Sequence, residues 1–426
     1  MKKHNKRYLI VSLSSFVALA TTLSIILMYA FVWGRSVLEK HLFTEPRTPI
    51  NLPHQNQSQE YINAIRDFSI TLNRVIEEQE DNENYVFSPV SVANNLYMLY
   101  EISEGTSKNR IKTLLNIDDT VFNHVDEVAK TIENNLHNVI DNKGRGHIIS
   151  NVSQALLCDN HFVGNLDSTY LDILSNKYYS ETYSADFSSD IINDIQNEYF
   201  NKKTESHYSL NTSSINHKTD GKRNVSVMGT TYLDVNWHDS FFPSRYNTFT
   251  NYDGSTRNNL NYFLQEYYLE LRYIYEGDDY IISCLDFLGY YAIYFLIPNL
   301  NSDYKQVLAD NYHNLINLSG EKQYLASTLW SIPEFKCSSN YDFSDLLKDN
   351  ALSNNASLDG INHFAGIDIN DYGLVGMEIE KKGKEETLVA YGSDVPYLTI
   401  CVDRPFMFAV MDVDGLPLLT GRVLKL

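Results

Sequence analysis

The sequence is poor in cysteine and in basic residues, and each shortage excludes a class of protein. Its 426 residues include four cysteines, none of them in a Cys-x-x-Cys pair: Cys158, Cys284, Cys337 and Cys401. Four cysteines allow three disulfide pairings and their spacing selects none, so we expect free and mostly buried thiols. Lys and Arg number 34 against 54 Asp and Glu, a net charge of −20 that repels phosphate and argues against a nucleic-acid partner.

The motifs of common enzyme classes are also missing. There is no Gly-x-Ser-x-Gly, no His-Glu-x-x-His and no glycine loop for phosphate, and the 12 histidines are scattered. We therefore expect no enzyme activity, no cofactor and no metal site. Asp412-Val413-Asp414-Gly415 resembles part of a calcium loop, but a turn between two strands explains this segment better.

One long apolar run is present, at the N-terminus. Residues 1–7 form a basic flank, and residues 8–34 contain no charged side chain. A run of this length can cross a hydrocarbon layer of about 30 Å, whereas the apolar stretch of a cleaved signal peptide has roughly 7–15 residues. We expect a transmembrane signal anchor with its N-terminus in the cytoplasm and the remaining chain extracellular or lumenal. Cleavage at Ala18-Leu19-Ala20, which would give a secreted protein, is the alternative, and a buried helix is a third interpretation.

Residues 35–60 are predicted to be a linker, because they are polar and include Pro46, Pro49 and Pro53. Six Asn-x-Ser/Thr triplets fit a glycoprotein on the secretory route, although a chain rich in Asn and Ser also produces such triplets by chance. These triplets begin at Asn56, Asn151, Asn211, Asn224, Asn317 and Asn355.

Beyond the linker, helical patterns come early and strand patterns come late. Apolar residues recur at helical spacing in Tyr61–Glu78, and Ser88-Pro89 is typical of a helix start, with a hydroxyl cap and a proline in the first turn. Asn224–Leu233 and Tyr290–Pro298 have the composition of strands, the second of them buried on both faces. This distribution indicates one α+β domain, residues 61–426, built around large sheets.

A set of motifs follows in a fixed order along this domain. Its first half comprises Phe87–Val92, Tyr178–Ser180, Ala185–Phe187, Asn197–Phe200 and Thr231–Leu233 with Trp237. Its second half comprises Pro333–Lys336, Ser338–Leu347, Glu378–Gly383, Arg404–Phe408 and Pro417–Val423. In this order and at roughly this spacing, the segments resemble the serpin family from about Tyr61 to Leu426.

The resemblance implies three β-sheets, about eight or nine helices and an exposed reactive-centre loop from Lys384 to about Ile400. In a serpin, a protease cuts this loop and forms an acyl-enzyme, and the cut loop then inserts into the main sheet as a new strand and traps the enzyme. We therefore expect a monomeric suicide-substrate inhibitor of an extracellular or lumenal serine protease. The segments with Ser88, Ser91 and Trp237 match those that support the main sheet in the family.

The hinge of the loop fits the resemblance least. Small residues usually follow the hinge glycine, but after Gly383 the sequence reads Lys384-Glu385-Glu386-Thr387-Leu388. In the family's register, Lys384 and Glu386 would point into the core on insertion, and burial of an unpaired charge costs several kcal/mol. Slower insertion would let the protease hydrolyse the acyl bond first. The alternative prediction is therefore a non-inhibitory serpin that acts as a binding or interaction module.

Other positions also depart from the family pattern. Lys381 stands where the family has a glutamate, although Glu380 is adjacent. Gly373 aligns with the histidine that ties the central strands of the main sheet together, and Gly229 aligns with an asparagine of the upper strand. The loop is also a few residues shorter than that of a typical inhibitor, which leaves the position of the reactive bond open.

Two bonds are therefore candidates for cleavage. Counting forward from Gly383 puts the bond between Tyr397 and Leu398, which suits a chymotrypsin-like protease. Counting back from Arg404 puts it between Asp394 and Val395, which suits an Asp-specific protease. We favour Tyr397–Leu398, because the length that inserts is measured from the hinge. In a non-inhibitory protein neither bond is a functional target.

Overall fold

The computed structural model describes residues 36–46, 58–116, 148–208, 224–238, 241–288, 291–347, 352, 356–374 and 395–426. Within these residues the chain forms three sheets and seven α-helices, and the predicted α+β class is confirmed. The α-helices are α2 (Val37–His41), α3 (Gln59–Gln79), α4 (Pro89–Ile102), α5 (Gly105–Leu114), α7 (Ser168–Lys177), α8 (Ile191–Lys203) and α9 (Tyr304–Asn317). Two short 3₁₀ helices are η1 (Val163–Asn165) and η3 (Ser344–Leu346).

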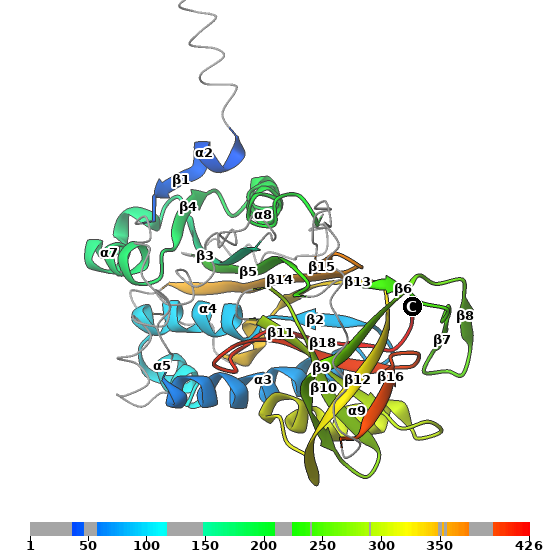
Figure 1. Cartoon of the computed structure of the whole chain (residues 1–426). Helices are drawn as coiled ribbons and strands as arrows, with labels where there is room; N and C mark the ends of the chain where they lie inside the picture. Colours follow the sequence, from blue (N-terminus) through cyan, green and yellow to red (C-terminus); the bar gives the residue numbers. More distant parts are fainter. Residues whose placement is uncertain are drawn as a thin grey trace, which may run out of the picture.

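A seven-stranded sheet crosses the molecule between two layers of helices (Figure 1). Its strands, in spatial order, are β1 (Leu42–Thr44), β4 (Glu181–Ala185), β3 (Ile148–Asp159), β5 (Asn224–Asn236), β15 (Gly373–Leu374), β14 (Ser357–Ile369) and β13 (Phe335–Asp342). The long strands β5 and β14 also pair directly and in parallel, from Asn224 opposite Ser357 to Thr231 opposite Ala365. The chain between these two strands builds most of the second sheet, which is the long connection that a parallel pair requires.

The second sheet has nine strands, and the third is a hairpin. In spatial order the nine-stranded sheet contains β16 (Tyr397–Cys401), β12 (Lys322–Pro333), β9 (Tyr262–Glu276), β10 (Tyr280–Asp286), β11 (Tyr291–Pro298), β17 (Phe406–Asp412), β18 (Pro417–Val423) and β2 (Tyr85–Phe87), with β6 (Phe242–Pro243) beside β9. The hairpin consists of β7 (Thr248–Thr250) and β8 (Thr256–Asn258). The carboxylate of Asp412 accepts the N–H groups of Asp414 (3.0 Å) and Leu416 (2.8 Å), so the predicted turn between two strands is confirmed.

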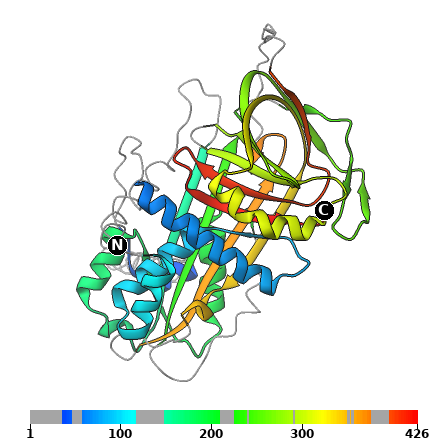
Figure 2. The same cartoon turned by 90° about the horizontal axis from the view of Figure 1, so that it is seen from below.

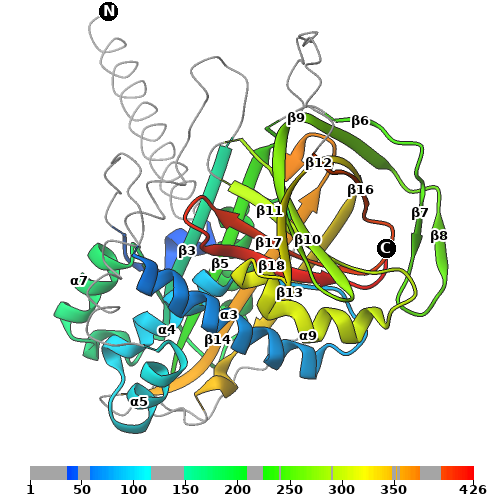
Figure 3. The same ribbon diagram turned by 60° about the horizontal axis from the view of Figure 1, so that its bottom comes forward.

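Helix α4 lies in the middle of the main core. As predicted, Ser88 caps this helix, since its Oγ accepts the N–H of Ser91 at 3.2 Å, and Pro89 follows in the first turn. Almost every residue of α4 is buried, because the seven-stranded sheet covers one side and α3 and β18 cover the other. Figures 2 and 3 show α3 running across this side next to α9. The predicted helix over Tyr61–Glu78 is thus confirmed as α3, and its apolar face meets α4.

The other face of the seven-stranded sheet is covered by α8. Tyr199 and Phe200 of this helix belong to a second apolar cluster with Tyr183, Met228 and Phe364. Phe200 reaches the β14 side of the sheet, with its ring centroid 5.6 Å from that of Phe364. One helix therefore bridges the outer faces of β4, β5 and β14.

Several predictions fall outside these elements. The predicted anchor at residues 8–34 and its basic flank at 1–7 lie outside the described residues. Of the helices that the structure does describe, none combines the length and the apolar character needed to cross a membrane. Part of the predicted linker, residues 37–44, is folded as α2 and β1, because Leu38 finds an apolar site beside α8 that a short polar sequence does not reveal. The four cysteines are free, as predicted, and three of them are buried.

Candidate functional site

The candidate site lies where β14 ends and the chain turns back into the seven-stranded sheet. Asn370 closes the turn: its side-chain oxygen accepts the N–H groups of Tyr372 (2.8 Å) and Gly373 (3.2 Å). The next two residues form β15, in which Leu374 pairs with Ile369 of β14 and with Val235 of β5. The chain therefore reverses direction and places a short strand between β5 and β14, antiparallel to both.

Only glycine fits at position 373. Its φ is +155°, and a Cβ added there would lie 2.0 Å from the carbonyl oxygen of Val235. The close approach of two backbones at this point is the reason, since any side chain would push β15 away from β5. Gly373 is therefore a turn residue at the end of β14, and its predicted alignment with the family's histidine is wrong.

Trp237 holds this turn from the end of β5. Its indole nitrogen donates to the carbonyl of Asn370 at 2.8 Å, and its backbone N–H donates to the carbonyl of Tyr372 at 2.9 Å. The indole ring is almost fully buried and stacks on Phe287, with centroids 4.4 Å apart. Trp237 thus lies at the point where β15 enters the sheet, which is the region that the sequence assigned to it.

A second group of side chains joins β5 and β14 from below, through the start of α4. The backbone N–H of Ser88 donates to Nε2 of His363 at 2.9 Å, and Oγ1 of Thr231 donates to Oγ of Ser88 at 2.7 Å. His363 belongs to β14 and Thr231 to β5, so Ser88 connects the two strands that would have to separate during insertion. His363, and not Gly373, is therefore the residue that corresponds to the strand-tying histidine of the family pattern.

The histidine is a neutral base. It has no exposed surface, and burial lowers its pKa to about 3. An unprotonated Nε2 can accept the N–H of Ser88, whereas an imidazolium would point a donor at another donor. The sequence carried a signal for this residue, because His363 interrupts an alternation of apolar residues from Ile361 to Ile367.

Gly229 of β5 lies opposite His363, and a side chain from α4 fills the space beside it. A Cβ at this position would lie 2.6 Å from Oγ of Ser91 and 2.7 Å from the amide of Asn95. The side-chain nitrogen of Asn95 donates to the carbonyl of Met228 at 3.1 Å. In this orientation its side-chain oxygen accepts the N–H of Gly229 at 3.3 Å. An asparagine from α4 thus supplies an amide beside the strand where the family pattern has one on the strand itself. No local pattern in the sequence indicates this exchange.

The far end of the loop is held by the nine-stranded sheet. Tyr397 and Leu398 lie in β16 opposite Ser327 and Thr328 of β12, and the carbonyl of Pro396 accepts the N–H of Ser327 at 2.9 Å. A protease that cuts between Tyr397 and Leu398 would first have to unpair these residues. The hinge predicted at Gly383–Leu388 and the residue Asp394 lie outside the described residues, while Val395 comes just before β16.

The described part of the chain offers no other chemistry at this place. It contains no group of three His, Cys, Asp or Glu side chains arranged to hold a metal ion. Burial raises the pKa of Cys401, the cysteine nearest to the loop, to about 12, so its thiol is not a nucleophile at neutral pH. The feature observed at this place is a short strand, β15, that lies between β5 and β14.

Comparisons with known proteins agree with this geometry. Residues 63–426 match the family model described as Serpin (serine protease inhibitor). No curated protein matches the sequence. Among solved structures the chain is similar to Tengpin, a thermophilic serpin in its native state, with a TM-score of 0.67 at 18% identity, over 92% of this chain and 99% of that chain.

Two further structures show the range of similar proteins. Serpin48 of the insect Tenebrio molitor, a highly specific serpin, has a TM-score of 0.67 at 18% identity, over 87% of this chain and 99% of that chain. Human thyroxine-binding globulin, in complex with thyroxine, has the same TM-score of 0.67 at 18% identity, over 86% of this chain and 99% of that chain. At such identities the likeness shows a shared fold.

Proposed function

Because the chain belongs to the serpin family, we propose that it is a suicide-substrate inhibitor of an extracellular or lumenal serine protease. A protease would cut the segment between Leu374 and Tyr397, and the cut segment would then extend β15 along the line between β5 and β14. The observation that carries the proposal is β15 itself, because Gly373 and Leu374 already lie between these strands and run antiparallel to both.

Extension of β15 is favourable for backbone pairing. At present β5 and β14 share one parallel ladder, from Asn224–Ser357 to Thr231–Ala365. A strand between them would replace this ladder with two antiparallel ladders, which are slightly more stable per residue. Each inserted residue gains partners on both sides, so the sheet supplies the driving force that pulls an attached protease along.

We place the start of insertion at Gly373 instead of Gly383, because β15 already pairs with β5 and β14 at this point. Directly opposed residues in neighbouring strands lie on the same face of a sheet. Position 374 is opposite Val235, which is fully buried in the main core. If the strand continued in this register, Gly376, Glu378 and Glu380 would follow on the core face. The first steps of insertion would thus be easy, and two carboxylates would oppose the later ones.

These carboxylates support a second candidate, a non-inhibitory serpin that acts as a binding or interaction module. Burial of an unpaired carboxylate costs several kcal/mol, and a barrier about 2–3 kcal/mol higher slows insertion roughly 100-fold. A protease would then deacylate before it is trapped. Thyroxine-binding globulin has a similar structure, and its name states that it binds a small molecule.

The position of the reactive bond is also a proposal. Tyr397 follows Gly383 by a fixed number of residues. The same number counted from Gly373 leads to Thr387, which puts the reactive bond between Thr387 and Leu388. Asp394–Val395 and Tyr397–Leu398 are the other candidates, and the pairing of Tyr397 in β16 is an argument against the last. A chymotrypsin-like target follows only if Tyr397 precedes the cut.

The deciding experiment mixes the purified protein with chymotrypsin-like, elastase-like and Asp-specific proteases and separates the products on a denaturing gel. We expect a band at the combined mass, which is the trapped acyl-enzyme, and a small fragment whose N-terminal residue identifies the cut bond. Complete cleavage without such a band would favour the non-inhibitory module.

A matched pair of variants tests the register. Glu378→Ala combined with Glu380→Ala removes both core-facing charges, and we expect the trapped share of protease to rise about tenfold or more. Glu385→Ala makes the same chemical change at a position whose side chain would point away from the core, and we expect no rise in the trapped share of protease. An equal effect of both changes would contradict insertion from Gly373.

We also propose that residues 8–34 anchor the protein in a membrane, with the serpin domain extracellular or lumenal. The length of the uncharged run and the basic flank before it support this placement. Alkaline extraction of membranes that carry the full-length chain, followed by protease treatment of sealed vesicles, tests it. Release by alkali would favour the secreted form.

A further inference from the structure

Residues 36–45 lie as a strap across the edge of the seven-stranded sheet, on the side covered by α8. The hydroxyl of Ser36 caps α2, and β1 then pairs antiparallel with β4 as the outermost strand of the sheet, with Leu42 opposite Tyr183 and Thr44 opposite Thr182. Figure 1 shows α2 and β1 beside α8 and above β4. The strap precedes residues 63–426 and therefore lies outside the part of the chain that matches the family model.

The strap is attached to three elements. The N–H of Val37 donates to the carboxylate of Glu198 on α8 at 2.7 Å, and Nδ1 of His41 lies 2.8 Å from the carbonyl oxygen of Ser184 on β4. Ser175 of α7 donates to the carbonyl of Glu45 at 3.0 Å. Leu38 is 2% exposed and belongs to the apolar cluster beneath α8. These contacts join α8 to the edge of the sheet.

Separation of β5 from β14 disturbs the same cluster. Met228 and Tyr232 of β5 and Phe364 of β14 all belong to it, together with Tyr199 and Phe200 of α8. If β5 and β14 moved apart, Phe364 would leave its partners on α8 or α8 would have to shift. The position of α8 therefore controls how easily the sheet opens.

The interface between α8 and the sheet contains a buried amide that lowers its stability. The amide of Gln196 is fully buried on the sheet side of α8, and neither its nitrogen nor its oxygen has a hydrogen-bond partner among the described residues. Buried polar groups without partners destabilise the interface that contains them. The strap attaches α8 to the sheet from outside this interface.

We propose that the strap keeps α8 seated on the seven-stranded sheet and thereby slows the separation of β5 and β14. It is a brake on strand insertion, built from residues that precede the inhibitor domain. The brake concerns the opening of the sheet, which can be measured without a protease. Only its consequence for trapping rests on the proposed function.

The test measures amide hydrogen exchange in the full-length chain, with substitutions in the strap. Leu38→Ala removes the buried side chain, and Glu198→Gln removes the charged acceptor of Val37. Glu39→Ala is the control, because Glu39 is an exposed neighbour on the same helix. For Leu38→Ala we expect exchange in α8 and at the paired amides of β5 and β14 to accelerate about tenfold or more, and for Glu39→Ala we expect no change.

The amides of β17 and β18, in the other sheet, serve as an internal reference. Unchanged exchange there, together with faster exchange in α8, β5 and β14, supports the strap. Equal acceleration in both sheets would mean general destabilisation and overturn the proposal, and so would faster exchange in α8 alone. If the wild-type protein traps no protease but the exchange pattern holds, the strap stands and the inhibitor function fails.

Discussion

His363 lies between the two central strands as a fully buried, neutral base. Burial lowers its pKa from the ordinary 6.5 to about 3. Between these two pH values an unfolded chain binds a proton at this residue that the folded chain does not. The corresponding stability is therefore fully present above pH 6.5 and is lost as the pH falls toward 3.

Replacement of the histidine should remove this pH dependence. Between pH 6.5 and about 5 the wild-type protein should lose roughly 2 kcal/mol through His363 alone, and His363→Gln should not show this part of the loss. Urea unfolding at the two pH values measures the difference. His161→Gln is the control, because the side chain of His161 is 87% exposed. An identical acid profile for wild type and His363→Gln would contradict the assignment.

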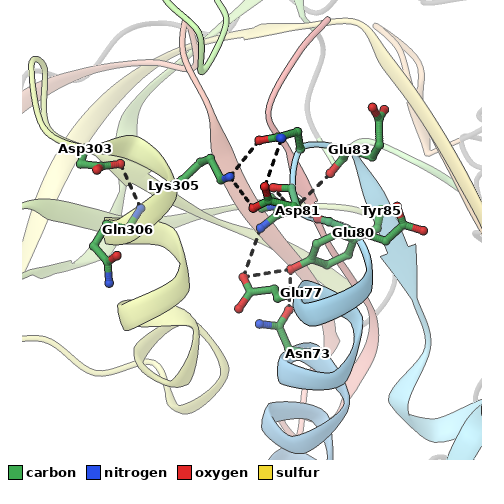
Figure 4. Close-up of polar contacts among 11 residues, drawn as sticks. Asn73, Glu77, Glu80, Asp81, Glu83, Tyr85, Asp303, Lys305 and Gln306 are labelled. Carbon is green, nitrogen blue, oxygen red and sulfur yellow. Dashed lines mark hydrogen bonds and ion pairs between the residues drawn. The ribbon is translucent and has the colours of Figure 1, made fainter.

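Arg422 of β18 organises the turn after α3. Its side chain is 3% exposed, lies 3.4 Å from the carboxylate of Glu77 and stacks over Tyr85 at 4.7 Å from the ring centroid. It also donates to the carbonyls of Glu80, Asp81 and Glu83. Figure 4 shows the acceptors Glu77, Glu80, Asp81 and Glu83 together with Lys305, which donates to Asp81 at 2.7 Å. The planar guanidinium reaches these acceptors from two separate nitrogen atoms in a fixed fork, and the single nitrogen of an ammonium group does not match that geometry.

Arg422→Lys should therefore be destabilising although it keeps the charge. We expect a loss of about 2–3 kcal/mol, because the carbonyls of this turn and the carboxylate of Glu77 would lose partners. Chemical denaturation measures it. Lys425→Met removes the neighbouring, exposed partner of Glu83 and should change little. Equal effects of the two substitutions would show that Arg422 acts only through net charge.

At the scale of the element, β15 is the part of the molecule most sensitive to a single methyl group. Gly373→Ala would place a Cβ 2.0 Å from the carbonyl of Val235, so β15 should leave the sheet while β5 and β14 stay paired below it. We expect insertion of the cut loop to slow about tenfold or more, since its first two residues no longer lie in register.

The rise in thermal stability after cleavage of the loop, followed over time, measures this rate. Gly164→Ala is the matched control, because a Cβ there meets no atom within 4 Å. If Gly373→Ala inserts as fast as the control, β15 is not the starting point of insertion.

At the scale of the whole molecule, cleavage of the loop should raise the melting temperature sharply. The native protein keeps β5 and β14 in one parallel ladder, and a full-length strand between them would add a second ladder and close the sheet. Thermal unfolding before and after limited proteolysis tests this. A protein whose melting temperature is unchanged after complete cleavage does not insert its loop and belongs to the non-inhibitory class.

Elements with a long, regular pattern could be predicted from the sequence. The helices α3 and α4, the strand β5 and the turn at Asp412–Gly415 occur where periodicity, a capping serine and a turn signal indicated them. The short elements α2 and β1 could not be predicted, because so few residues carry no periodicity. Their stability comes from α8 and β4, which are distant in the sequence.

The sequence by itself determined the family, the α+β class and the absence of enzyme motifs, because these depend on local composition and on the order of motifs. Only the tertiary structure decided which glycine turns the chain into the sheet and which histidine ties the strands. Both depend on strand register: Gly373 is selected by the carbonyl of Val235 and His363 by the N–H of Ser88. Register is set by pairing across long sequence distances, so spacing along the chain can mark a core-facing position such as 363 but cannot reveal its partner.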